Sequence, residues 1–190
     1  MLDYDIENEL RPNLSANEKL VWVGKPQAGI VLRKSDAFLI PFSLFWAGFA
    51  IFWEAGVSIS GAPFFFKLWG IPFVLMGLYI TVGRFFVDAR KRKNIVYGLT
   101  KDRIIIKSGI FNKEVKSLNI RTISDITFSQ KADNSGTINL GPVDPRFGMM
   151  QGMNWPGVKM ANSLDMIENV QNVYDKIIEL QRGVIVPASN

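Results

Sequence analysis

The sequence predicts a membrane-spanning α-helical hairpin followed by a small α+β domain, in which antiparallel strands are capped by a C-terminal helix. Two long apolar runs lie close together, at residues 37–53 and 68–83, and the basic cluster 90–93 follows them. Beyond the cluster, short apolar runs alternate with polar residues, a pattern typical of strands with one buried face. We therefore expect an N-terminal cytoplasmic segment (1–35), a transmembrane hairpin (36–87), a cytoplasmic domain (88–183) and a tail (184–190).

The composition fits a chain that lies partly in lipid and partly in water, with 21% charged residues and a mean hydropathy of +0.13. Cys and His are absent, which excludes disulfides, zinc sites built on these residues and catalytic dyads or triads that need them. Asp125, Asp133 and Asp144 stand where Asp serves local hydrogen bonding, and no spacing pairs two carboxylates. We predict no enzymatic activity, no catalytic residue, no metal and no cofactor.

The two apolar runs are long enough to cross a bilayer. The first has 17 residues without a charge, which gives about 25 Å of helix, and we expect spans at about 37–53 and 65–86. Trp46, Trp53 and Trp69 are residues of the kind that collect at membrane interfaces. The alternative is a soluble protein with two buried helices, but two such runs are more apolar surface than so small a core can bury.

The flanking charges predict the orientation of the hairpin. Arg33 and Lys34 precede the first span and residues 90–93 follow the second, whereas the connection 54–62 has one acidic and no basic residue. Because Lys and Arg near a span stay on the cytoplasmic side, we expect both termini in the cytoplasm and the protein in the inner membrane. Lys67 lies near the outer end of the second span, where its side chain can snorkel to the headgroups. The acidic N-terminus predicts no cleaved export signal.

The elements of the domain follow from its turns and alternation. Lys101-Asp102 makes a tight connection, after which Ile104 and Ile106 point inward and Ile105 points to the opposite, polar face. We expect strands at 95–100, 103–107, 114–120, 125–129 and 137–140. A helix is expected from a cap at Asn162 or Ser163 to Gly183, covering one open side of the sheet. Its apolar stripe consists of Met166, Ile167, Val170, Val173, Tyr174, Ile177 and Ile178.

Three motifs suggest a family. They are Trp22-Val23-Gly24-Lys25-Pro26 ahead of the first span, the stretch 97–106 after the second, and the stretch 136–141. With these motifs the chain resembles bacterial membrane proteins in which two transmembrane helices precede a pleckstrin-homology-like (PH-like) domain. The resemblance implies a PH-like fold, a bent antiparallel sheet or partial barrel capped by a C-terminal helix. It does not imply phosphoinositide binding, because fold does not fix function.

One half of the domain is strongly basic. Ten Lys or Arg residues lie between Arg90 and Arg121, against only Asp102 and Glu114. Near an anionic leaflet each cation contributes about 1 kcal/mol. The charges therefore either enforce topology on a solvated face, contact anionic lipid in general, or form a specific headgroup pocket. The candidate headgroup contacts are Arg90, Lys91, Arg92, Lys93, Lys101, Arg103, Lys107, Lys113 and Lys116.

The connection at residues 141–161 is long for a compact domain and rich in methionine. Flexible apolar side chains suit an adaptable contact with a protein or with the bilayer surface. The alternative is that this connection folds back over the domain. The candidate partner contacts are Met149, Met150, Met153, Trp155 and Met160.

Together these features predict a non-enzymatic integral membrane protein. Its domain is expected to act as an interaction module, or as a subunit or scaffold of a membrane assembly. The alternative is a domain that binds or senses anionic lipid. The expected partners are membrane lipids and a protein partner or a second copy. A small-molecule substrate is not evident, and nucleic acid is not expected because the basic half is tethered at the membrane and has few interleaved aromatics.

Overall fold

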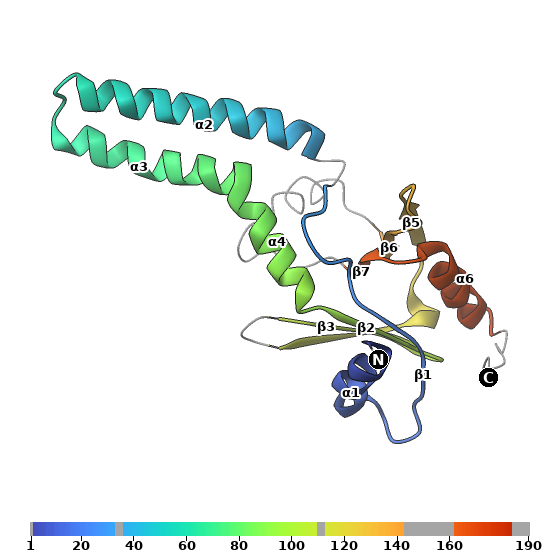
Figure 1. The fold of residues 1–190 in the computed structure, drawn as a ribbon. Helices are drawn as coiled ribbons and strands as arrows, with labels where there is room; N and C mark the ends of the chain where they lie inside the picture. Colours follow the sequence, from blue (N-terminus) through green and yellow to red (C-terminus); the bar gives the residue numbers. More distant parts are fainter. Residues whose placement is uncertain (1, 33–35, 110–112, 143–161, 184–190) are drawn as a thin grey trace. The chain divides into compact units, whose positions relative to one another are not determined.

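The computed structural model describes residues 2–32, 36–109, 113–142 and 162–183. The chain forms two compact units (Figure 1). The first consists of Met1–Gly29, Arg90–Val143 and Lys159–Asn190, and we call it the sheet unit. The second consists of Ile30–Ala89 and Asp144–Val158, and we call it the hairpin unit.

The described strands of the sheet unit form two antiparallel sheets, which do not close into a barrel within the described residues. The order of the first sheet is β1-β2-β3-β4 and that of the second is β5-β6-β7. The strands are β1 (Leu20–Gly24), β2 (Val96–Thr100), β3 (Arg103–Ser108), β4 (Glu114–Asn119), β5 (Ile126–Gln130), β6 (Gly136–Leu140) and β7 (Ser163–Ile167). The helices are α1 (Leu2–Leu10), η1 (Arg11–Asn13), η3 (Ile120–Thr122) and α6 (Val170–Gln181).

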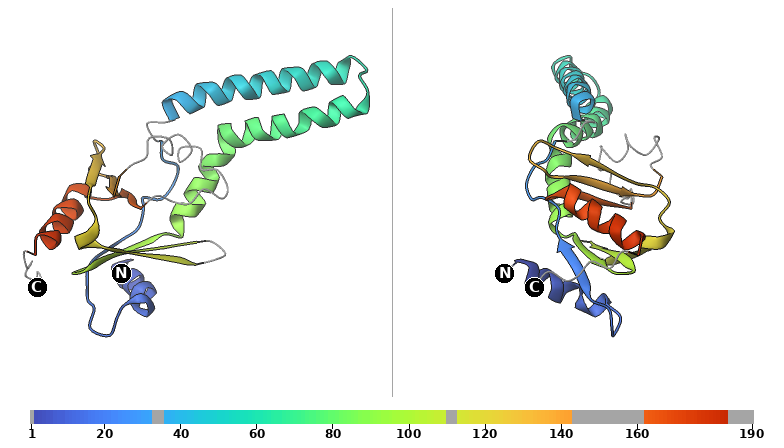
Figure 2. Two further views of the ribbon diagram at one scale, coloured as in Figure 1. Left: turned by 180° about the vertical axis from the view of Figure 1, so that it is seen from behind. Right: turned by 90° about the vertical axis from the view of Figure 1, so that its right-hand side faces the viewer.

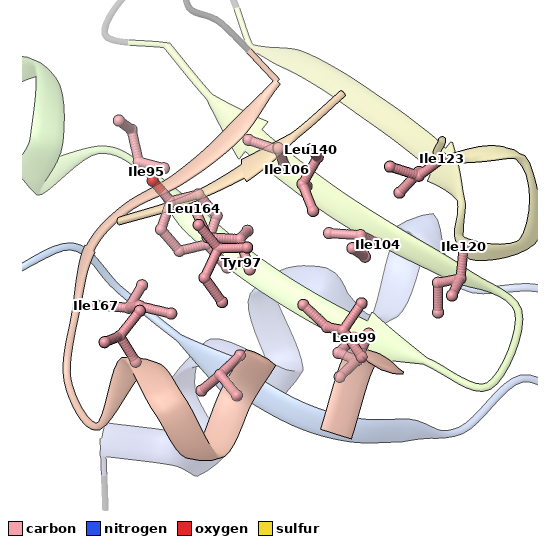
Figure 3. Packing of buried hydrophobic residues seen from close by; sticks show 14 residues of the cluster. Ile95, Tyr97, Leu99, Ile104, Ile106, Ile120, Ile123, Leu140, Leu164 and Ile167 are labelled. Carbon is pink, nitrogen blue, oxygen red and sulfur yellow. The ribbon is translucent and has the colours of Figure 1, made fainter. Parts of the chain in front are cut away.

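One apolar core joins both sheets and α6, which contacts β5, β6 and η3 (Figures 2 and 3). Tyr97 of β2 is fully buried in this core, and its hydroxyl accepts a hydrogen bond of 2.9 Å from the backbone N–H of Asp165 in β7. This bond links the two sheets. The labelled core residues are Ile95, Tyr97, Leu99, Ile104, Ile106, Ile120, Ile123, Leu140, Leu164 and Ile167.

The opposite face of the first sheet is covered by α1. Ile6 and Leu10, one turn apart, pack on Val96 and Ile105. A Cβ on Gly98 would lie 2.8 Å from Leu10, so glycine makes room for that side chain. The expectation of a polar outer face at Ile105 was therefore wrong, because Ile105 is 1% exposed.

Five strands were predicted where β2 to β6 lie, to within a residue or two at their ends. The strand β1 was not predicted. It pairs with β2, although the whole hairpin lies between the two strands in the sequence. In this pairing Trp22 lies opposite Leu99, and Gly24 lies opposite Tyr97. The Trp22 ring lies over Gly24, where a Cβ would collide with it. This contact explains the glycine in the motif.

The C-terminal helix was predicted to begin too early. Ser163 starts β7 rather than capping a helix, and β7 pairs with β6 through Ile138 and Leu164. An extra residue in β7 between its pairs with Ile138 and Gly136 forms a bulge, where Met166 has φ 49° and its N–H donates to the Thr137 hydroxyl at 3.2 Å. The helix α6 begins only at Val170, after Asn169 with φ 48°.

The hairpin unit consists of α2 (Asp36–Ile59), α3 (Phe64–Leu78), the π-helical turn η2 (Tyr79–Gly83) and the first part of α4 (Arg84–Lys93). Asp36–Ile59 and the continuous stretch Phe64–Lys93 are each long and apolar enough to cross a membrane. The 24 residues of α2 extend about 36 Å.

The helix α2 extends further at its C-terminal end than the predicted first span, residues 37–53. Residues 54–59 belong to α2, so Glu54 lies inside the helix rather than in the connection. Its carboxylate lies against Gly70 of α3, at the place where a Cβ on Gly70 would be. Along the rest of the interface the buried residues of α2 are mostly small, and Gly77 of α3 approaches Ala47 closely. Small residues allow two helices to pack at short range in lipid.

Candidate functional site

The two ends of the first sheet differ in what attaches to them. In the antiparallel pair of β1 and β2, Gly24 lies opposite Tyr97, and Leu20 lies opposite Thr100. The hairpin connects the end of β1 to the start of β2, so both of its ends attach at the same end of the sheet, which we call the neck end. The end of β3 and the start of β4 also lie at the neck end, because Ser108 pairs with Glu114. The turn at Lys101–Asp102 lies at the opposite, far end.

At the neck end, Arg92 of α4 binds the segment that follows β1. Its Nη1 donates to the carbonyl of Gln27 at 2.7 Å, and its Nη2 donates to the carbonyl of Gly29 at 2.6 Å. The Gln27 N–H in turn donates to the Met166 carbonyl of β7 at 2.7 Å. Arg92 is 2% exposed, so it serves the fold and does not present its charge to a ligand.

At the far end, Arg103 forms a two-point ion pair with Glu18. Nε and Nη2 of Arg103 donate to the two carboxylate oxygens at 2.8 and 2.6 Å. Arg103 also donates to the carbonyl of Asn13 at 3.0 Å and thereby fixes the link between α1 and β1. The hydrogen bond from Arg103, with a further one from the Ser15 N–H, lowers the pKa of Glu18 to about 2.

The replacement Glu18→Gln is expected to destabilise the protein at pH 7 by about 2 kcal/mol. Because the pKa of Glu18 falls from 4.5 to about 2 on folding, its contribution is complete above about pH 4.5 and is lost as the pH falls toward 2. Urea unfolding in detergent micelles should therefore show the difference between wild type and variant shrinking across this range. A difference that stays constant with pH, or an equal loss in the control Glu179→Gln on the exposed side of α6, would contradict this account.

Two further lysines meet Glu9 of α1. The Lys107 ammonium donates to the Glu9 carbonyl at 2.7 Å and lies 3.6 Å from Oε1 of its carboxylate. The Lys25 ammonium lies 3.9 Å from Oε2 of the same carboxylate. Lys25 was not among the predicted site residues. It follows directly on β1, and its proximity to Lys107 depends on the pairing of β1 with β2.

The structure thus separates cations that sequence reasoning had grouped together. Arg90, Lys93 and Lys113 are exposed at the neck end, and Lys91 and Lys116 are partly buried there. Lys101 is exposed at the far end. The predicted partner contacts Met149, Met150, Met153, Trp155 and Met160 lie outside the described residues. Within the described residues, no group of three or more acidic side chains could hold a metal ion.

Sequence reasoning missed a buried ion pair in the hairpin unit. Arg84 Nη1 and Asp36 Oδ1 are 2.5 Å apart, and the two side chains are 3% and 5% exposed. The Nε of Arg84 donates to the carbonyl of Ile80 at 2.7 Å, within the π-helical turn. The available signal was an acidic residue just before the first apolar run and a basic residue just after the second, since a hairpin brings these two places together.

Comparison with known families identifies the chain. The family model described as "Bacterial PH domain" matches residues 39–180, well over half of the sequence. The chain belongs to the bacterial PH domain family. The match confirms the predicted resemblance and includes the hairpin as well as β2 to β7. In this bacterial PH domain protein, helices and two antiparallel sheets form the fold, and membership suggests an interaction or lipid-binding module. Neither curated proteins nor solved structures give a match.

Proposed function

We propose that this bacterial PH domain protein is a non-enzymatic, membrane-anchored module whose neck end contacts anionic lipid headgroups. The observation that carries the proposal is the position of the hairpin between the paired strands β1 and β2. Strands that share hydrogen bonds lie on one side of a membrane, so the chain crosses an even number of times between them. The basic residues at 90–93 favour the cytoplasmic side for the sheet unit and for both termini.

Chain length supports headgroup contact at the neck end. Only Asn94 and Ile95 separate α4 from β2, which is a reach of about 10 Å. The exposed cations Arg90, Lys93 and Lys113 lie at this end of the sheet. Each cation near an anionic leaflet contributes about 1 kcal/mol, so three of them are enough to enrich anionic lipid around the protein.

The test compares two triple variants of equal charge in reconstituted vesicles. One neutralises the neck end (Arg90→Gln, Lys93→Gln, Lys113→Gln) and the other the far end (Lys19→Gln, Lys101→Gln, Arg121→Gln). Electron paramagnetic resonance measures the association of spin-labelled phosphatidylglycerol relative to spin-labelled phosphatidylcholine. We expect the neck variant to lose the preference for phosphatidylglycerol and the far-end variant to keep it.

Equal behaviour of the two triple variants would remove the headgroup proposal. Orientation is checked in both backgrounds with single cysteines, since the sequence has none of its own. An impermeant thiol reagent is expected to reach Ser58→Cys from the outside, and Ser15→Cys only after the membrane is opened.

A role as a subunit or scaffold is the second candidate, and it is favoured by sheet edges that no other described strand covers. β4 forms one edge of the first sheet and β5 one edge of the second. Val115 of β4 is 41% exposed and Phe128 of β5 is 39% exposed. Edge strands offer backbone groups to an added strand. A stoichiometric protein recovered with the tagged chain after gentle detergent extraction would support this role, whereas recovery with enriched anionic lipid alone would support the first proposal.

A further inference from the structure

The neck end contains a place where two cations converge on one carboxylate. Lys107 and Lys25 face the two oxygens of Glu9, at 3.6 and 3.9 Å. The two lysines come from β3 and from the residue after β1, which β2 brings together. Their ammonium groups are therefore set on either side of a single anionic group by the register of the sheet.

The Glu9 carboxylate is held loosely. Both of its distances to the lysines exceed the range of a hydrogen bond, and its side chain is 39% exposed. Surface ion pairs of this geometry add little to stability. The carboxylate can therefore turn toward water at small cost.

The rest of the arrangement does not depend on this carboxylate. Ile6 and Leu10 hold α1 on the sheet, and Lys107 keeps its place through the hydrogen bond of 2.7 Å to the Glu9 backbone carbonyl. Lys25 is 34% exposed on its side chain, which leaves a path for a ligand from solvent. When the carboxylate turns away, the ammonium group of Lys107 stays fixed by its hydrogen bond, and the ammonium group of Lys25 can adjust its position.

We propose that Lys25 and Lys107 form a binding site for a phosphate monoester, and that Glu9 occupies this site when the ligand is absent. A phosphate monoester carries a charge of about −1.5 to −2 and three acceptor oxygens, against one charge and two oxygens for Glu9. It therefore competes successfully for the two ammonium groups. The monoester can be a lipid headgroup of the phosphatidate type or a soluble phosphate, and the lipid source rests on the proposed position of the neck end.

The test uses the full chain in detergent micelles, with dioctanoyl phosphatidate, inorganic phosphate and the diester dioctanoyl phosphatidylglycerol as probes. Isothermal titration calorimetry compares Glu9→Gln with Glu7→Gln, which removes the same charge from an exposed position of the same helix. We expect Glu9→Gln to tighten phosphatidate binding about threefold to fivefold and Glu7→Gln to leave it unchanged. Lys25→Gln should weaken phosphatidate binding. It is the decisive lysine variant, because Lys107→Gln also removes a bond to the α1 backbone.

The outcomes separate the ligand sources and the two proposals. Tightening for phosphatidate alone assigns the site to a lipid headgroup, and equal tightening for inorganic phosphate assigns it to a soluble phosphate. Equal affinities of Glu9→Gln and Glu7→Gln, or an unchanged affinity of Lys25→Gln, would overturn the site. In the neck variant, with Arg90, Lys93 and Lys113 neutralised, Glu9→Gln should still tighten phosphatidate binding. The monoester site is therefore tested independently of general headgroup contact.

Discussion

Replacement of Arg84 by methionine is expected to destabilise the hairpin by about 3 to 5 kcal/mol. The reason is the buried partner, because the Asp36 side chain, which is 5% exposed, would lose the guanidinium group of Arg84 that it contacts. Unfolding by sodium dodecyl sulfate, followed through the tryptophan fluorescence, measures the loss. The exposed Arg90→Met is the matched control and should change the unfolding midpoint little.

A double variant tests the mechanism of this loss. Asp36→Leu alone should be as harmful as Arg84→Met, whereas Asp36→Leu with Arg84→Met should be more stable than either single variant. This follows because a buried pair replaced by apolar residues leaves no charge to desolvate. Additive losses in the double variant would mean that the two side chains act independently and that their contact contributes nothing.

Replacement of Arg92 by methionine should lower the stability of the sheet unit by about 3 kcal/mol. Each of its two hydrogen bonds joins a charged donor to a backbone carbonyl, and such bonds contribute about 1.5 kcal/mol or more. The loss should appear in thermal unfolding of the purified protein in micelles. Arg92→Lys should recover part of it, since an ammonium group keeps the charge but does not reproduce the fork that reaches both carbonyls.

Two results would contradict this role of Arg92. One is an unchanged melting temperature in Arg92→Met, with Lys93→Met as the exposed neighbour for comparison. The other is equal stability of Arg92→Lys and wild type, which would show that charge alone matters at this position.

The local parts of the fold could be predicted because their signals are local. Alternation and turn residues place β2 to β6, and the apolar runs place the hairpin helices. The strand β1 could not be predicted in this way, because its partner β2 lies beyond the hairpin in the sequence. The same limit hides α1, whose apolar residues Ile6 and Leu10 have a function only once the outer face of the first sheet exists.

The error at the start of the C-terminal helix has a different cause. Met166 and Ile167 continue the helical spacing of Val170 and Val173, so the apolar stripe alone cannot separate strand from helix here. The deciding contacts are polar and distant, namely the Thr137 hydroxyl that receives the Met166 N–H and the pairing with β6.

The basic residues show what a count of charges along the sequence can and cannot predict. It correctly marked the segment in which cations gather, but Arg92 and Arg103 are engaged with backbone carbonyls and with Glu18. A carbonyl acceptor carries no sequence signal, so such internal use is visible only in the fold. Sequence reasoning also passed over Lys25, which stands alone in the sequence and gains its neighbour Lys107 only through strand pairing.

The hairpin lies in the sequence between two paired strands of the first sheet, β1 and β2, and this order constrains how the protein is synthesised and folds. β1 leaves the ribosome before either apolar helix and must wait, unpaired, until β2 follows. If only one helix entered the bilayer, β1 and β2 would be left on opposite faces of the membrane, and the sheet would lack its edge strand together with the bonds from Arg92 to Gln27 and Gly29. In the proposed membrane-spanning arrangement, the first sheet can therefore be completed only when both helices of the hairpin enter the bilayer.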